Sequence, residues 1–327
     1  MKKKIAIIGA GLAGLVCANM LKEKNTITVF EKSRGVGGRM ATRYKDSFEF
    51  DQGAQYFTAK TPEFQKFLET PIKENIIAEW NPKFVEFDFD KIVSKAKWGE
   101  HYPHFVAKPR MSSLAKFLSQ NLVIKSQTKI KKLIRENEKW NLIDENENFY
   151  SGFDLLILAI PNSQALEIIP TNFSFLKEVQ NIKMLGCFSL MLGFEKPLAL
   201  QFEAALVKNS KISWIAVNSS KPERKSSFSL LVNSSNTYAQ ENIEKDLGLI
   251  KEELIEELSE IIKINCNQSA YSDIFRWRHA NSSKINGDKF FFDQNLNIAL
   301  CGDWCFQGRV ESAFLSGYSL AKSLSCS

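Results

Sequence analysis

The residues nearest the start of the chain that could do chemistry are a run of glycines and one glutamate. The segment 9–14 (GAGLAG) follows an apolar run, 5–8, and Glu31 comes twenty residues after Gly11. Glycines at this spacing let the backbone turn tightly and approach a pyrophosphate, and the helix expected next directs its N–H groups at that anion. A carboxylate after a second strand, 27–30, accepts hydrogen bonds from ribose hydroxyls and repels a 2′-phosphate. The pattern predicts bound FAD or NAD rather than NADP.

A second glycine-rich loop and a turn near the end of the chain favour FAD over NAD. The glycines of segment 37–39 (GGR) allow close backbone approach, and Arg39 can place its planar guanidinium on pyrophosphate oxygens. At the far end, Asp303 follows an apolar strand, 297–301, and could bond ribityl or ribose hydroxyls. A helix beginning near Val310 could stabilise negative charge on a reduced flavin. The alternative for the 37–39 loop is a basic surface loop without a ligand.

Five segments spread over the chain resemble those of renalase-like flavoproteins, a family related to the flavin amine oxidases. The matching segments are 37–39 (GGR), 50–58 (FDQGAQYFT), 213–222 (SWIAVNSSKP), 276–280 (RWRHA) and 301–304 (CGDW). The resemblance runs from residue 5 to about residue 323. Three positions depart from it: His279 stands where the family usually has Tyr, and Phe275 and Asn233 stand where many bacterial members have His.

The resemblance implies an FAD-dependent oxidase that holds its FAD non-covalently. Its substrate would be an isomeric (2- or 6-) dihydro-NAD(P), which gives a hydride to flavin N5, and O2 would then take the electrons to yield H2O2 and NAD(P)+. Such a ring becomes an aromatic cation without losing a proton, so no general base is required. The sequence agrees, since it shows no Ser-His-Asp or paired-carboxylate pattern and only three histidines, His101, His104 and His279.

Two other functions stay open at this point. A flavin amine oxidase acting on small amines would need its amine neutral, and an aromatic cage or a base usually lines such a pocket. A non-catalytic FAD-binding protein is the second alternative, because the substrate half departs from the family pattern. An NAD-dependent dehydrogenase without flavin is disfavoured by the segments 37–39 and 301–304.

Four residues are candidates for the substrate pocket. Gln55 could face the flavin ring and orient a carboxamide, or it could make a hydrogen bond at a strand end. Trp214 and Trp277 could stack on a nicotinamide, although buried strand tryptophans are often core residues. His279 is more simply a hydrogen-bonded structural residue than an acid or base. The residues predicted to contact FAD are Gly9, Ala10, Gly11, Ala13, Gly14, Glu31, Lys32, Gly38, Arg39, Met40, Ala54, Gln55, Ile130, Gly302, Asp303, Val310 and Glu311, with Ile130 assigned by analogy with related flavoproteins.

The expected fold class is α/β, with two domains. The resemblance implies a Rossmann-type FAD-binding domain, GR2-like and similar to p-hydroxybenzoate hydroxylase, over residues 1–60, 101–165 and 290–327. An inserted α+β substrate domain on an antiparallel sheet would take residues 61–100 and 166–289. Ser112 and Asn162 are each expected to cap the helix that follows it. A hairpin is expected over 128–143, and the expected elements of the insertion are strands at 184–194, 212–217, 228–232 and 271–278 and a helix at 249–262.

Composition excludes several classes of protein. The 327 residues are 44% hydrophobic with a formal net charge of +6, and the short basic stretches do not interleave with aromatics, so no nucleic-acid partner is expected. Residues 2–17 resemble a secretory signal, but cleavage would remove the glycines, and no other stretch is long and apolar enough to span a membrane. The six cysteines form no CxxC pair, so we expect no metal site and a cytoplasmic location. A covalent flavin link at Cys305 is a minor alternative.

Overall fold

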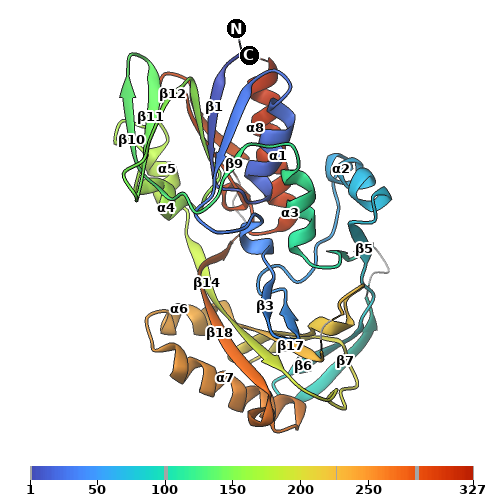
Figure 1. Cartoon of the computed structure of the whole chain (residues 1–327). Helices are drawn as coiled ribbons and strands as arrows, with labels where there is room; N and C mark the ends of the chain where they lie inside the picture. The colour runs from blue at the N-terminus through green and yellow to red at the C-terminus, as the bar shows by residue number, and fades with distance from the viewer. Residues whose placement is uncertain (1, 99–101, 226, 284–286, 327) are drawn as a thin grey trace. The chain divides into compact units, whose positions relative to one another are not determined.

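The chain forms two compact units, each built from separate stretches of sequence. The computed structural model describes all residues except 1, 99–101, 226, 284–286 and 327 (Figure 1). The first unit comprises Met1–Gly38, Leu114–Met184 and Asn281–Ser327, and the second comprises Arg39–Ser113 and Leu185–Ala280. Parallel and antiparallel sheets are both present, which confirms the predicted α/β class.

A six-stranded sheet forms the centre of the first unit, in the order β19-β20-β13-β1-β2-β9. The strands are β1 (Lys4–Ile8), β2 (Thr26–Phe30), β9 (Ile124–Lys125), β13 (Leu155–Leu158), β19 (Phe290–Asp293) and β20 (Ile298–Cys301). All neighbours pair in parallel except β19 and β20. Continuous apolar runs such as Leu155–Leu158 suit a parallel sheet because its strands are buried on both faces.

Two helices from opposite ends of the chain pack together in this unit. They are α1 (Leu12–Leu21) and α8 (Val310–Cys326), which lie side by side in Figure 1. Gly317 makes this possible, because a Cβ there would lie 2.3 Å from the carbonyl oxygen of Ala13. Within the described residues, no helix is both long and apolar enough to cross a membrane.

A small antiparallel sheet also belongs to the first unit. It contains β10 (Ile130–Glu136), β11 (Lys139–Asp144) and β12 (Phe149–Phe153), and β10 and β11 form the predicted hairpin. Both turn residues have positive φ, 48° at Asn137 and 61° at Glu138, as a tight hairpin turn requires. The short helices α4 (Asn162–Leu166) and α5 (Leu176–Asn181) follow β13.

A seven-stranded sheet forms the second unit, in the order β18-β14-β17-β16-β15-β6-β7. The strands are β6 (Lys83–Asp88), β7 (Lys91–Lys97), β14 (Met184–Gly193), β15 (Ala204–Lys208), β16 (Ile212–Val217), β17 (Ser229–Ser234) and β18 (Tyr271–Ser282). Helices α6 (Asn236–Asn242) and α7 (Leu247–Ile262) bury their apolar sides against one sheet face. The predicted strands of the insertion and its helix are therefore present.

The other face of this sheet is partly covered by the hairpin of β3 (Arg43–Lys45) and β4 (Phe48–Phe50). Phe48 and Phe50 pack there against Met191 and Leu231. The remaining elements are β5 (Ile77–Glu79), paired with β8 (Phe105–Ala107), and the helices α2 (Pro62–Lys73) and α3 (Ser112–Ser119).

Two predicted helix caps are wrong. Asn162 is the first residue of α4, and its side-chain amide donates to the carbonyl oxygens of Val179 and Ile182 instead of capping. Ser112 begins α3, and its buried hydroxyl has no hydrogen-bond partner among the described residues. In both cases burial against other elements outweighs the local capping preference.

The compact units have different bounds from the predicted domains. Residues 39–60 and 102–113, predicted for the FAD-binding domain, pack within the second unit, while 166–184, 281–283 and 287–289 pack within the first. Buried polar contacts of Asp51 with Met111, Lys221 and Arg224, described below, tie 39–60 and 102–113 to the second unit. The predicted domains were drawn by expected cofactor contacts rather than by packing, and they stay a prediction.

The contact at Gly317 leads to a stability prediction. We expect Gly317→Ala to lower the free energy of unfolding by about 1–3 kcal/mol, because the new methyl group must push backbone of α1 away. Urea unfolding followed by circular dichroism measures this. Ser319→Ala on the same helix is the control, since it adds no atom near α1. A Gly317→Ala protein that gains stability, as a glycine-to-alanine change in an open helix does, would contradict the expectation.

Candidate functional site

The three glycines of segment 9–14 serve different purposes in the first unit. Gly9 has φ +105°, and a Cβ there would lie 2.5 Å from the carbonyl oxygen of Ala159. At Gly14 a Cβ would lie 2.2 Å from the carbonyl oxygen of Gly9. At Gly11 it would meet nothing within 4 Å. Packing within the protein therefore explains Gly9 and Gly14 but not Gly11, whose open backbone fits the approach of a pyrophosphate.

The N-terminus of α1 is also suited to an anion. Gly11 is its N-cap residue, no side chain caps the helix, and its first turn has no acidic residue. The carboxylate of Glu31, which is buried, accepts hydrogen bonds from the backbone N–H groups of Ala10 and Ser33, each at 2.8 Å. Each oxygen keeps a further lone pair for a ribose hydroxyl. The helix end thus fits the pyrophosphate of an adenosine diphosphate group, and the fixed carboxylate fits its ribose.

The second glycine loop lies against the first. Gly37 and Gly38 both have positive φ, and the N–H of Gly37 donates to the carbonyl oxygen of Ala10 at 2.9 Å. A Cβ at Gly38 would come 3.6 Å from the Cα of Gly11. The two predicted glycine segments are therefore brought together within the first unit.

The turn near the end of the chain reaches the same sheet edge. Strands β1, β2 and β20 run parallel within the sheet, so Gly9, Glu31 and Gly302 all follow the carboxyl ends of their strands. The N–H of Gly302 donates to the hydroxyl of Ser316 at 2.8 Å, and α8 begins at Val310, as predicted. Ligands of such folds bind at this edge.

Other residues predicted to contact FAD differ in their burial and in their hydrogen-bond partners. Asp303 and Ile130 are buried in the first unit, as Met40 is in the second, whereas Lys32 is exposed and donates to Gln164 at 3.1 Å. Arg39 donates from Nη1 to the carbonyl oxygen of Ala280 at 3.2 Å, within the second unit. Their roles toward FAD stay predictions.

The cysteines beside this turn are buried and protonated. Cys301 and Cys305 are buried free thiols, and burial raises the pKa of Cys301 to about 12 and that of Cys305 well above its usual value. Protonated thiols do not suit a covalent flavin link. Among the described residues, no group of three or more His, Cys, Asp or Glu side chains could hold a metal ion.

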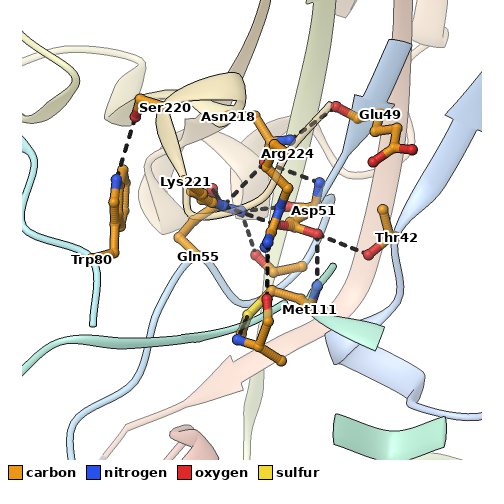
Figure 2. A network of polar contacts seen from close by, with 12 residues as sticks. Thr42, Glu49, Asp51, Gln55, Trp80, Met111, Asn218, Ser220, Lys221 and Arg224 are labelled. Atoms are coloured by element: carbon orange, nitrogen blue, oxygen red, sulfur yellow. Dashed lines mark hydrogen bonds and ion pairs between the residues drawn. The ribbon is translucent and has the colours of Figure 1, made fainter. Parts of the chain in front are cut away.

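A buried ion cluster around Asp51 organises the second unit (Figure 2). Oδ2 of Asp51 accepts from Arg224 Nη2 at 2.6 Å and from Lys221 Nζ at 3.2 Å. Oδ1 accepts from the hydroxyl of Thr42 at 2.8 Å and from the N–H of Met111 at 3.1 Å. The side chains of Asp51, Lys221 and Arg224 are fully buried. Because one carboxylate meets two cations, these three side chains carry a net positive charge when Lys221 is protonated.

The protonation states of the cluster reflect this pairing. Burial by itself would raise the pKa of Asp51, but the Lys221 and Arg224 cations lower it to about 2. For Lys221, burial lowers the pKa to about 8, although the Asp51 carboxylate opposes that shift. The cluster is therefore ionised at neutral pH.

Gln55 is part of this cluster. Its Nε2 donates to the backbone carbonyl oxygens of Asp51 and Gly53, at 2.5 and 2.8 Å, and its Oε1 accepts from Lys221 Nζ at 3.1 Å. Asn218 joins from the other side, since its Oδ1 accepts from Lys221 Nζ at 3.1 Å. These contacts favour the hydrogen-bonding alternative for Gln55 over an orienter of substrate. Our sequence reasoning missed Asp51, Lys221 and Arg224, although the first two lie in segments 50–58 and 213–222, which carry the family resemblance.

An aromatic cluster lies on the side of the seven-stranded sheet that faces away from α6 and α7. We define it by Tyr56, Phe84, Trp98, His104 and Trp214. Trp98 stacks on His104 with ring centroids 4.0 Å apart, and its centroid lies 5.4 Å from that of Trp214. Burial lowers the pKa of His104, and its Nδ1 has no partner among the residues that the structure describes. Apart from this imidazole and the phenol of Tyr56, the members of the cluster carry no ionisable group, so the cluster as defined is neutral at pH 7.

The structure separates the two predicted tryptophans. Trp214 belongs to the aromatic cluster, whereas Trp277 packs against Phe275, with centroids 4.5 Å apart, and donates from Nε1 to the carbonyl oxygen of Gln52 at 2.9 Å. His279 is half-buried on β18. His101 lies outside the described residues.

Comparisons with known proteins establish the family. Residues 7–70 match the NAD(P)-binding Rossmann-like domain, and residues 84–324 match the flavin containing amine oxidoreductase family. Because the second match covers most of the sequence, the chain belongs to the flavin-containing amine oxidoreductase family. It is a flavin-dependent oxidoreductase, and its cofactor is FAD.

Similar solved structures share the fold over nearly the whole chain. A candidate protoporphyrinogen oxidase from Exiguobacterium sp. 255-15 has a TM-score of 0.79 at 12% identity, covering 99% of both chains. A redesigned putrescine oxidase, a triple mutant, has a TM-score of 0.71 at 11% identity over 99% of both chains. An oxidoreductase from Methanosarcina mazei has a TM-score of 0.74 at 14% identity, covering 98% of this chain and 100% of that one.

One curated relative is similar over a short stretch of the chain. The 4,4'-diapophytoene desaturase of Staphylococcus aureus is 49% identical over 51 residues, which is 15% of this chain and 10% of the desaturase. The match thus spans about a tenth of the length of that relative, and the substrate of the desaturase is not carried over to this chain.

The open space at Gly11 leads to a prediction about the cofactor. We expect Gly11→Ala to leave the Tm of the apoprotein unchanged, because no protein atom lies within 4 Å of the added methyl group. FAD binding should weaken by about tenfold or more, since the methyl group would occupy the pyrophosphate's approach. Fluorescence titration of apoprotein with FAD measures this. Gly14→Ala is the contrasting variant, because it should destabilise the apoprotein itself.

The pairing of Asp51 leads to a stability prediction. Asp51→Asn should lower the free energy of unfolding by about 3–5 kcal/mol, since it leaves two buried cations without a counter-charge. Because the folded-state pKa of Asp51 lies near 2, below its usual value, the wild-type advantage should be full above about pH 4 and decline as the pH falls from there toward 2. Urea unfolding of both proteins at several pH values checks the magnitude and the direction.

Asp293→Asn is the matched control for Asp51→Asn. Asp293 is also buried, though less deeply, and it accepts from neutral groups, namely the N–H and hydroxyl of Ser174 and the N–H of Leu296. Its loss should cost less, about 1–3 kcal/mol. Equal losses in the two variants would show that the charge pairing of Asp51 is not what stabilises the second unit.

Proposed function

We propose that this protein oxidises isomeric (2- or 6-) dihydronicotinamide dinucleotides to NAD(P)+, with O2 as the final electron acceptor. The substrate ring loses a hydride, which is one proton with two electrons, and becomes an aromatic cation. O2 takes up two electrons and two protons and is released as H2O2. The second proton needed to form H2O2 comes from solvent. FAD supplies the hydride acceptor and the reaction with O2 when it is bound.

The observation that carries the proposal is a meeting of three separate segments in the second unit. The segments 50–58, 213–222 and 276–280 all resemble renalase-like proteins, and the last two are more specific to that family than the FAD motifs. Lys221 of the second segment holds Asp51 and Gln55 of the first. Trp277 of the third donates to the backbone of Gln52. The three segments that resemble the family therefore meet in one hydrogen-bonded assembly, and this supports the proposal.

The chemistry of the aromatic cluster supports a neutral, flat substrate. Its members are rings, and its one titratable imidazole, His104, has a lowered pKa and is neutral at pH 7. A dihydronicotinamide needs neither a base nor a counter-ion when it gives up a hydride. We therefore assign Trp214 to the substrate, and Gln55 and Trp277 to positioning of the segment that contains Tyr56.

We also propose that the protein works in the cytoplasm. Five cysteines, namely Cys17, Cys187, Cys266, Cys301 and Cys305, are buried free thiols, the state expected in a reducing compartment.

Anaerobic titration of the FAD-loaded protein tests the proposed reaction. We expect rapid bleaching of the flavin by the 2- or 6-dihydro forms and little bleaching by the ordinary 4-dihydro form. Readmitting air should restore the yellow colour and release one H2O2 for each substrate oxidised. Faster bleaching by putrescine or another alkyl amine would instead show a flavin amine oxidase. A flavin that stays oxidised with every donor would favour a role for FAD that is not catalytic.

A further inference from the structure

The indole N–H of Trp214 is a buried donor without a partner. The Trp214 side chain is half-buried, its Nε1 is covered by neighbouring atoms, and no described residue accepts its hydrogen bond. A buried tryptophan N–H normally finds an acceptor, because leaving it unpaired costs free energy. Four other tryptophans of this chain do donate, namely Trp80 to Ser220, Trp140 to Leu296, Trp277 to Gln52 and Trp304 to Ile160.

A second side-chain donor stands directly opposite Trp214 on the sheet. The register of β16 and β17 pairs Trp214 with Asn233, and directly opposed residues have Cβ atoms about 4.5–5.5 Å apart. Oδ1 of Asn233 accepts from the hydroxyl of Ser189 at 2.9 Å, which orients the amide, and Asn233 is half-buried, so its Nδ2 is available to an acceptor that reaches this face.

A local irregularity sets this pairing. The register shifts between Ile212 and Trp214, and the hydroxyl of the intervening Ser213 donates to the carbonyl oxygen of Ser234 at 2.8 Å. The next residue, Ile215, is buried on the side of α6 and α7, so Trp214 points to the opposite face. Without Ser213 as an extra residue in β16, Trp214 would point toward the face covered by α6 and α7.

The surroundings select the kind of acceptor. Rings of Tyr56, Phe84 and Trp98 lie near Trp214, at centroid distances of 5.6, 6.2 and 5.4 Å. The cation beside the aromatic cluster, Lys221, lies over the ring of Trp80 next to Trp98 and is already paired with Asp51, so a carboxylate would find no unpaired cation there, and desolvating it is costly. A neutral carbonyl on a flat ring is the matching chemistry.

We propose that Trp214 Nε1 and Asn233 Nδ2 form a donor pair that binds the carbonyl oxygen of a carboxamide carried by a flat ring. The assignment of that ring to nicotinamide rests on the proposed function, whereas the donor pair itself rests on Trp214 and Asn233. The pair would thus determine specificity for carboxamide-bearing rings.

Calorimetric titration of the FAD-loaded protein with benzamide and with toluene tests the donor pair. Both probes are flat rings, but only benzamide carries the carbonyl oxygen. We expect the wild-type protein to bind benzamide, and Trp214→Phe and Asn233→Leu each to weaken that binding by roughly threefold to tenfold. Toluene binding should change less than benzamide binding, since toluene carries no oxygen that could accept from either donor and Trp214→Phe removes only part of the apolar ring surface.

Trp140→Phe is the matched control, because it removes an indole N–H that is bonded to Leu296, in the first unit. It should lower the Tm and leave benzamide binding unchanged, whereas Trp214→Phe should change binding without lowering the Tm. The proposal is overturned if wild-type protein does not bind benzamide, if both site variants bind it normally, or if toluene binding falls equally. A different result would separate the two proposals. If dihydronicotinamides fail to bleach the flavin while benzamide binding still depends on Trp214 and Asn233, the proposed function is refuted and the donor pair is not.

Discussion

The second unit depends on the pairing of one buried carboxylate with two buried cations. Asp51 receives hydrogen bonds from Thr42, Met111, Lys221 and Arg224, which belong to three well-separated stretches of the chain. Removing such charges from water is costly, so the arrangement persists only while every partner is in place. Because Lys221 also holds Gln55, the same pairing fixes the backbone that carries Tyr56 into the aromatic cluster.

The first unit prepares its site by the opposite means, through the absence of side chains. Gly9 and Gly14 let backbone segments touch, and Gly11 leaves space that no protein atom occupies. The uncapped end of α1 and the fixed carboxylate of Glu31 then suit a ligand with a central pyrophosphate and a ribose. Membership of the flavin-containing amine oxidoreductase family agrees with this arrangement.

Both units contain a feature that their own packing does not explain, and each is the basis of a proposed ligand contact. In the first it is the open space at Gly11, and in the second it is the unpaired N–H of Trp214. Local inconsistencies of this kind are expected where function, and not folding, determines a residue. FAD itself supplies the redox chemistry. The chain contributes by binding FAD and substrate, orienting them and excluding competing reactions.

The sequence by itself determined the parts that depend on local spacing. Apolar runs followed by glycine turns predicted β1, α1, β20 and α8, and parallel strands must bring their carboxyl ends to one edge. Only the tertiary structure decided how Gln55, Trp214 and Trp277 are used. Lys221 meets Gln55 across 166 positions of sequence, and Trp277 meets Gln52 across 225. Nothing in a local pattern fixes such distant partners, because burial and hydrogen bonding select them only once the chain has folded.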